Sequence, residues 1–201
     1  MTLRAYALTA DENGRFQEAA ASYEAALLSD PADLETTVNL AVLYWRAIGR
    51  GRSAPSSLPQ EFLKEAPKRL RELLESAGDR AVSEGDRAAS EGIPSGETPS
   101  GGERFADRAE LRFWKKYIAA ADAGELLDPG ECRQLLQERP DYLEPAFVVF
   151  SDSAGEEAEP EAMRLLVDYS EQPTARGRYV TAIIDAVMRK QRWHAGLEPT
   201  A

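Results

Sequence analysis

Residues 14–44 read GRFQEAAASYEAALLSDPADLETTVNLAVLY, and this stretch predicts two helices joined by a short turn. In its first half, small and apolar residues recur three and four positions apart, as they do on one face of an α-helix. These residues are Phe16, Ala19, Ala20, Tyr23, Ala26 and Leu27. Pro31 ends the first helix, because proline lacks an amide hydrogen and disfavours a helical conformation in the residue before it. The second helix follows and carries Val38, Ala41, Tyr44 and Trp45 on one side.

The same residues resemble the motif of the tetratricopeptide repeat family. Ala19 and Tyr23 stand where that motif has a small residue and, four positions on, an aromatic, and Pro31 stands at its closing proline. The pair Leu40-Ala41 and Tyr44 match the first helix of the next unit. Small residues at such positions let two helices approach closely, while the aromatics fill the space between successive hairpins.

The spacing inside the sequence agrees with this resemblance. Ala7 and Ala41 are 34 positions apart, which is the length of one unit in the family. The resemblance covers residues 3–45 and implies an all-α fold, an α-solenoid of stacked antiparallel helical hairpins. It also implies function by binding, since the family receives a partner's peptide or helix in a concave groove lined by the first helix of each unit.

The resemblance assigns eight positions to the exposed surface of that groove. They are Arg4, Leu8, Glu35, Val38, Asn39, Val42, Trp45 and Arg46. Some members of the family clamp a partner's terminal carboxylate with Lys and Asn side chains. Asn39 matches one Asn of that clamp, but Leu8 stands at the place of the other, so the full clamp is not expected.

The rest of the chain predicts two helical lobes joined by a flexible linker. Residues 1–77 form the first lobe, with helices over 2–12, 16–28 and 34–48, a breaker-rich insertion at 49–59 and a further helix through Phe62 to Leu74. Residues 78–104 predict the linker, because GDRAVSE is repeated as GDRAASE and a Gly-, Pro- and Ser-rich run follows, with almost no large apolar residue to bury. Transient helix is expected in the duplicated part of this linker. Residues 105–193 form the second lobe, a degenerate repeat that ends in a capping helix. Its helices are expected over about 105–124, 129–138, 142–150, 161–169 and 174–193.

Whole-chain properties restrict the class of protein. With 201 residues and a net charge of −11, the surface does not suit the phosphate contacts of a nucleic-acid binder. No apolar run approaches the roughly 18 residues of a membrane span. Cys132 is the only cysteine, which favours a reducing, cytoplasmic compartment over a disulfide framework.

The sequence carries no recognisable catalytic, metal or cofactor motif, so no cofactor and no enzymatic activity are expected. Cys132 and His194 are the only nucleophile and base of that kind, and a buried structural cysteine with a solvated histidine is the favoured interpretation. Four carboxylates around one turn are interpreted as helix-end charges rather than a metal site. They are Asp122, Glu125, Asp128 and Glu131. The basic and aromatic run 112–117 is interpreted as a core helix rather than a base-stacking surface.

These observations favour a non-enzymatic protein-interaction module or adaptor whose partner is another protein. A structural subunit that self-associates as a homo-oligomer or extends a larger assembly is the alternative, and an unrecognised activity in the second half is the least favoured. Arg46, Arg50 and Arg52 gather at the end of the third helix, where cations complement the helix dipole. A docking patch for an acidic partner is the second interpretation of these arginines.

Overall fold

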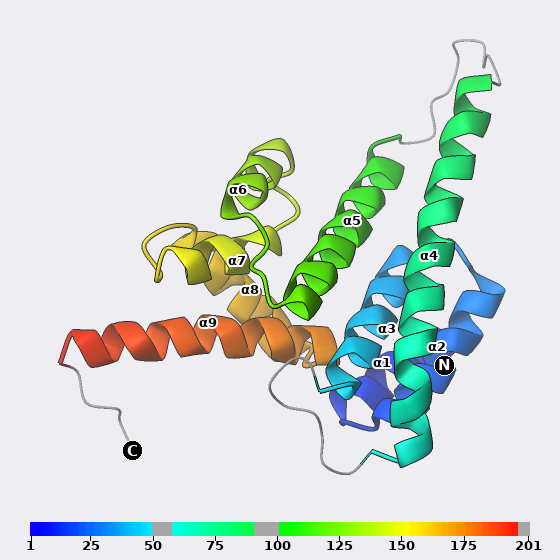
Figure 1. Ribbon diagram of the computed structural model, residues 1–201, viewed down its shortest axis with the longest axis horizontal. Coiled ribbons are helices and arrows are strands. Elements are labelled where there is room, and N and C mark those ends of the chain that lie inside the picture. The colour runs from blue at the N-terminus through cyan, green and yellow to red at the C-terminus, as the bar shows by residue number, and fades with distance from the viewer. Residues whose placement is uncertain (50–57, 91–100, 197–201) are drawn as a thin grey trace.

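The computed structural model describes residues 1–49, 58–90 and 101–196, and all regular structure in this part is helical (Figure 1). The prediction of an all-α fold is confirmed. The helices are α1 Leu3–Glu12, α2 Phe16–Ser29, α3 Leu34–Ala47, α4 Gln60–Ser90, α5 Gly101–Ala123, α6 Pro129–Glu138, α7 Pro145–Asp152, α8 Glu159–Glu171 and α9 Ala175–His194.

Local sequence signals explain the first three helices. Gly14 has a φ of +70°, the left-handed conformation that the tight turn between α1 and α2 requires. Asp33 caps α3, because its side chain accepts a hydrogen bond of 3.0 Å from the amide of Thr36. Ala7 and Ala19 are fully buried, and these small side chains let α1 and α2 pack closely as an antiparallel hairpin.

Helix α4 continues to Ser90 and α5 begins at Gly101, so helix extends into both ends of the linker expected over residues 78–104. Residues 91–100 of the expected linker and residues 50–57 of the expected insertion lie outside the described residues. The apolar face of residues 60–77 starts α4, and each further residue then adds a hydrogen bond without a new nucleation step. The Ala, Arg and Glu residues of the duplicated segment are good helix formers, so helix propagates into it although it has little to bury.

Helix α3 is the centre of the core. It packs on α2, α4, α5 and α9, and the run from Thr36 to Trp45 is buried on all sides. A helix that is apolar all round needs cover from more neighbours than its own hairpin supplies. One hydrophobic core therefore extends from Ala7 on α1 to Ile184 on α9, and the expected division into two lobes is not confirmed.

A buried polar link fastens the start of α9 to the N-terminal hairpins, which the first turn of α9 reaches in Figure 1. Asp11 of α1 is fully buried, and its carboxylate accepts hydrogen bonds from the amide of Ala175 at 2.7 Å and from Arg178 at 3.0 Å. The hydroxyl of Tyr23 lies 3.4 Å from the other carboxylate oxygen. Arg46 of α3 donates to the carbonyl of Ala175 at 2.8 Å, so both α1 and α3 hold this turn.

This link predicts a specific dependence of stability on pH. Burial raises the pKa of Asp11 from 3.8 to about 6, although Arg178 acts in the opposite direction. The folded state therefore keeps a proton that the unfolded state has already lost between these two values. The stability that this proton contributes is complete below pH 3.8 and is lost as the pH rises through about 6, a change of about 3 kcal/mol.

The measurement compares the protein with Asp11→Asn by urea unfolding between pH 4 and pH 7.5. The variant cannot titrate at this position, so the difference between the two proteins isolates Asp11 from every other group. The original protein should lose stability relative to the variant as the pH rises. A difference that stays constant, or that moves in the other direction, would show that Asp11 titrates like an exposed carboxylate.

A second buried polar cluster joins α5, α7, α8 and α9 around Glu144. Its carboxylate accepts hydrogen bonds from the indole N–H of Trp114 at 2.8 Å, from the hydroxyl of Tyr142 at 2.8 Å and from the hydroxyl of Tyr169. Arg176 lies beside it, with its Nε 3.5 Å from the carboxylate, and also pairs with Glu110. These contacts satisfy a charge that would otherwise be costly to bury.

Candidate functional site

The structure covers most of the predicted concave surface with the chain's own helices. Val38, Asn39, Val42 and Trp45 are buried, so their expected exposure is wrong. Arg46 is half-buried and points its guanidinium at the first turn of α9. Helices α5 and α9 pack on the face of α3 that the resemblance assigned to a partner.

Trp45 shows how this face is filled. It has no exposed surface, and its indole N–H donates to Asp122 of α5 at 3.1 Å. Its ring packs edge-to-face on Tyr179 of α9, with centroids 4.9 Å apart, and on Tyr117 of α5, at 6.0 Å. Trp45 is therefore a core residue.

Among the remaining residues of the predicted surface, Arg4 is exposed and Glu35 is half-buried. Arg4 is hydrogen-bonded to Glu35 and lies 3.7 Å from Asp33, so its charge is already compensated. Leu8 is half-buried. The buried Oδ1 of Asn39 has no hydrogen-bond partner in the described part of the chain, and its burial removes it from the reach of a partner's terminal carboxylate.

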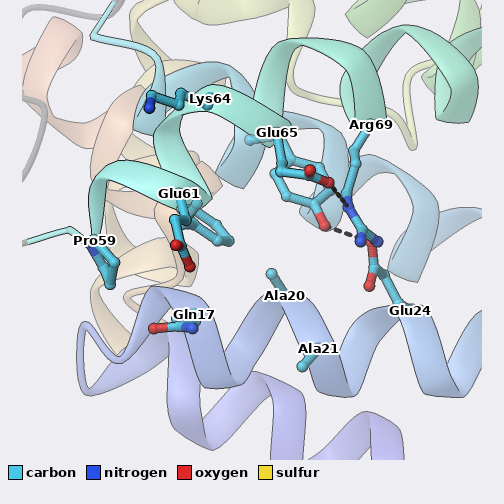
Figure 2. A pocket seen from close by; sticks show the side chains of 11 residues that line it. Gln17, Ala20, Ala21, Glu24, Pro59, Glu61, Lys64, Glu65 and Arg69 are labelled. Atoms are coloured by element: carbon cyan, nitrogen blue, oxygen red, sulfur yellow. Dashed lines mark hydrogen bonds and ion pairs between the residues drawn. The ribbon is translucent and has the colours of Figure 1, made fainter.

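An open groove lies elsewhere, between α2 and α4, with a volume of about 520 Å³ (Figure 2). Figure 2 shows the two helices running side by side in the same direction, with their side chains turned toward each other. The groove is lined by Gln17, Ala20, Ala21 and Glu24 of α2, by Tyr44 of α3, and by Pro59, Glu61, Phe62, Lys64, Glu65 and Arg69 of the α4 side.

Side-chain size explains why this groove stays open. Helices α2 and α4 both pack on α3. Ala20 and Ala21 are too short to reach across from α2 (Figure 2). Tyr44 and Phe62 form an aromatic floor, with ring centroids 5.8 Å apart. The result is an apolar base between two helical walls.

One end of the groove is polar and internally compensated. Glu24 accepts hydrogen bonds from the hydroxyl of Tyr44 at 2.6 Å and from Arg69 at 2.5 Å, and Glu65 lies 3.5 Å from Arg69. Burial raises the pKa of Tyr44 above its ordinary value, and the hydrogen bond to Glu24 acts in the same direction. No ion pair within the described residues involves Glu61, and Lys64 lines the same groove, so the other end carries one exposed charge of each sign.

The candidate nucleophile and base found in the sequence are not assembled into a site. Cys132 is buried in α6, and burial raises the pKa of its thiol to about 12, so it is protonated at neutral pH. His194 is exposed at the last residue of α9, and no hydrogen bond in the described part joins it to Cys132. The expected burial of Cys132 and exposure of His194 are confirmed.

Three of the four carboxylates around the turn between α5 and α6 have separate roles. Asp122 accepts from Trp45, Asp128 caps α6 through the amide of Gly130 at 2.9 Å, and Glu131 pairs with Lys116 at 2.6 Å. Over residues 1–49, 58–76 and 109–196, no group of three or more His, Cys, Asp or Glu side chains is placed to hold a metal ion.

The remaining candidate sites from the sequence are either part of the hydrophobic core or lie outside the described residues. In the run 112–117, Phe113 and Trp114 are buried while Lys115 and Lys116 are exposed, which confirms the core-helix interpretation. Arg50 and Arg52 lie outside the described residues. None of the described helices combines the length and apolar character that crossing a bilayer requires.

Comparisons of the chain with protein-family models, with curated proteins and with solved structures found no match. The tetratricopeptide resemblance therefore rests on the residues quoted above and stays a prediction.

Proposed function

We propose that this chain is a non-enzymatic protein-interaction module that holds a helical segment of a partner protein in the α2–α4 groove. The observation that carries the proposal is the open groove itself, which has an aromatic floor between two parallel helical walls. The concave face that the sequence predicted as the binding surface is instead mostly buried. We also propose that the first helices are arranged as in tetratricopeptide repeats.

The shape of the groove suits a third helix. An amphipathic helix can lay its apolar side chains between two helical ridges, which is a recurrent mode of peptide recognition. The short side chains of Ala20 and Ala21 leave room for close approach, and Tyr44 and Phe62 offer apolar surface to a large side chain of the partner. The groove is open along its length and edged by exposed charged residues, which suits a chain segment better than an enclosed small molecule.

The charge of the groove indicates the chemistry of the partner. The side chains that line the groove include three carboxylates and two cations, and the whole chain carries a net charge of −11. A partner helix with a basic residue beside its apolar face would complement both features. A cytoplasmic location is part of the proposal and rests on the single cysteine, Cys132, which is buried and free.

The test begins with peptides of about 15 residues, selected on the protein from a random library. Ala21→Trp fills the groove with a large ring, and its matched control is Ala119→Trp on α5, since both positions are exposed. Selected peptides should bind Ala21→Trp at least tenfold more weakly, a loss of about 1.4 kcal/mol, and should bind the control as they bind the original. Both variants should melt within a few degrees of the original protein. Peptides that bind all three proteins equally would place the interaction elsewhere.

A structural role through self-association is the second candidate, and exposed apolar residues on α1 favour it. Leu3 and Tyr6 lie exposed, one helical turn apart, on the first hairpin of the chain. A second copy could cover them in the way that one hairpin covers the next in a helical array. Scattering that gives the mass of a dimer, and a monomer for Leu3→Glu with Tyr6→Glu, would support this candidate.

A further inference from the structure

A second concavity lies in the C-terminal half, between α5, α7 and α9, and is closed at one side by the turn that leads into α6. Its volume is about 250 Å³. Aromatic side chains from three helices form its floor: Tyr117 of α5, Phe147 of α7 and Tyr179 of α9. Glu125, Leu126 and Asp152 stand at its edge. We call it the C-terminal cleft.

The floor of the C-terminal cleft is held in place by its own contacts. Phe147 packs edge-to-face on Tyr117, with centroids 5.1 Å apart, and on Tyr179, at 6.4 Å. The hydroxyls of Tyr117 and Tyr179 are 2.6 Å apart, so one donates to the other and the acceptor keeps its own hydrogen for a further partner. Trp45 lies behind both tyrosines and fixes them from the core.

The edge of the cleft is acidic, and none of the residues that line it is basic. Asp152 lies 3.6 Å from Arg133, which it shares with Glu157. No ion pair in the described residues involves Glu125. Leu126, next to it, has 85% of its surface exposed, so a large apolar side chain stands in solvent at the mouth of the cleft.

We infer that the C-terminal cleft receives an arginine side chain of a partner protein, held between the aromatic floor and the carboxylates of Glu125 and Asp152. The cleft is smaller than the roughly 300–1,000 Å³ typical of small-molecule pockets, and its size suits one long side chain. A guanidinium stacks on aromatic faces and donates in a fork to carboxylates, while its aliphatic stem covers apolar surface. Arginine is also among the residues most often found as interface anchors. The site is distinct from the α2–α4 groove and does not depend on it.

The experiment uses two tripeptides that differ only in charge at the central side chain. Acetyl-Leu-Arg-Leu-amide is titrated into the isotope-labelled full chain and followed by amide chemical shifts, and the same peptide with citrulline in place of arginine is the neutral control. The arginine peptide should shift amides around the cleft, those of Ala121, Leu126 and Asp152 among them. The citrulline peptide should bind at least tenfold more weakly.

Paired variants separate the cleft from general attraction to an acidic protein. Glu125→Gln with Asp152→Asn should weaken the arginine peptide at least tenfold. Glu75→Gln with Glu171→Gln removes the same charge from exposed positions on α4 and α8 and should change the affinity less than twofold. All these positions are exposed, so both double variants should stay folded, with melts close to the original.

Three results would overturn the inference. They are equal binding of the citrulline peptide, equal weakening by both double variants, and no shifts at the cleft at the highest peptide concentration. The Ala21→Trp variant should bind the arginine peptide as the original does. The two proposals can therefore fail separately: peptide binding at the α2–α4 groove and arginine binding at the C-terminal cleft are tested by different variants.

Discussion

Trp45→Ala should lower the free energy of unfolding by about 3–5 kcal/mol, the range found when a buried tryptophan is truncated. The side chain is fully buried in α3 and touches α5 and α9, so its removal leaves a cavity where three helices meet. It also leaves the carboxylate of Asp122 without the indole N–H. Urea unfolding followed by circular dichroism measures the change.

Two other substitutions calibrate this result. Trp193→Ala, at a residue with 75% of its surface exposed, should change the free energy of unfolding by no more than about 0.5 kcal/mol. Trp45→Phe keeps an aromatic ring but removes the hydrogen bond to Asp122, so it should fall between the two alanine variants. If Trp45→Ala lowered the free energy of unfolding as little as Trp193→Ala, α5 and α9 would not cover α3 as described. Trp45 would then be available again as part of the concave binding surface that the resemblance predicts.

Glu144→Ala should be comparably severe, at about 3–5 kcal/mol, because it removes a buried carboxylate that accepts three hydrogen bonds and lies beside the buried Arg176. Arg176 would keep its pair with Glu110 but lose its second carboxylate, while Trp114, Tyr142 and Tyr169 would lose their hydrogen-bond acceptor. A buried donor that has lost its acceptor has given up its hydrogen bonds to water and gains no hydrogen bond in return, which lowers the stability of the folded state.

The matched controls separate shape from charge. Glu144→Gln keeps an oxygen acceptor of the same length and should lose less stability than the alanine variant. Glu171→Ala, at an exposed position on α8, should stay within about 0.5 kcal/mol of the original protein in the same urea titration. An alanine variant at Glu144 as stable as this control would mean that water already satisfies the cluster.

Local features of the fold could be predicted from the sequence because their causes are local. The cap at Asp33, the turn at Gly14 and the bounds of α6 depend on residues a few positions apart, and the bounds expected for α6 are the ones found. Composition alone does not predict where helix stops in the duplicated segment, because a helix that has already started needs only favourable propensity to continue.

The candidate sites could not be predicted, because each depends on contacts between distant parts of the chain. The groove exists only once α4 is placed beside α2, and Trp45 is covered by residues more than 70 positions away, such as Asp122 at a separation of 77. One signal of its burial was present. Residues 40–45 are apolar without interruption, which is typical of a helix covered on every side rather than one with a free binding face.

The link between Asp11 and Ala175 has a consequence for how the chain is made. The two residues are 164 positions apart, so the contact cannot form until nearly all of the described chain has left the ribosome. During synthesis the apolar face of α3 around Trp45 stays exposed until α5 and α9 cover it, and such exposed surface is prone to aggregation and to capture by chaperones. A tandem array with only neighbouring contacts can fold progressively from its first unit. This chain closes on itself, so its first hairpins stay incompletely packed until the start of α9 has been synthesised.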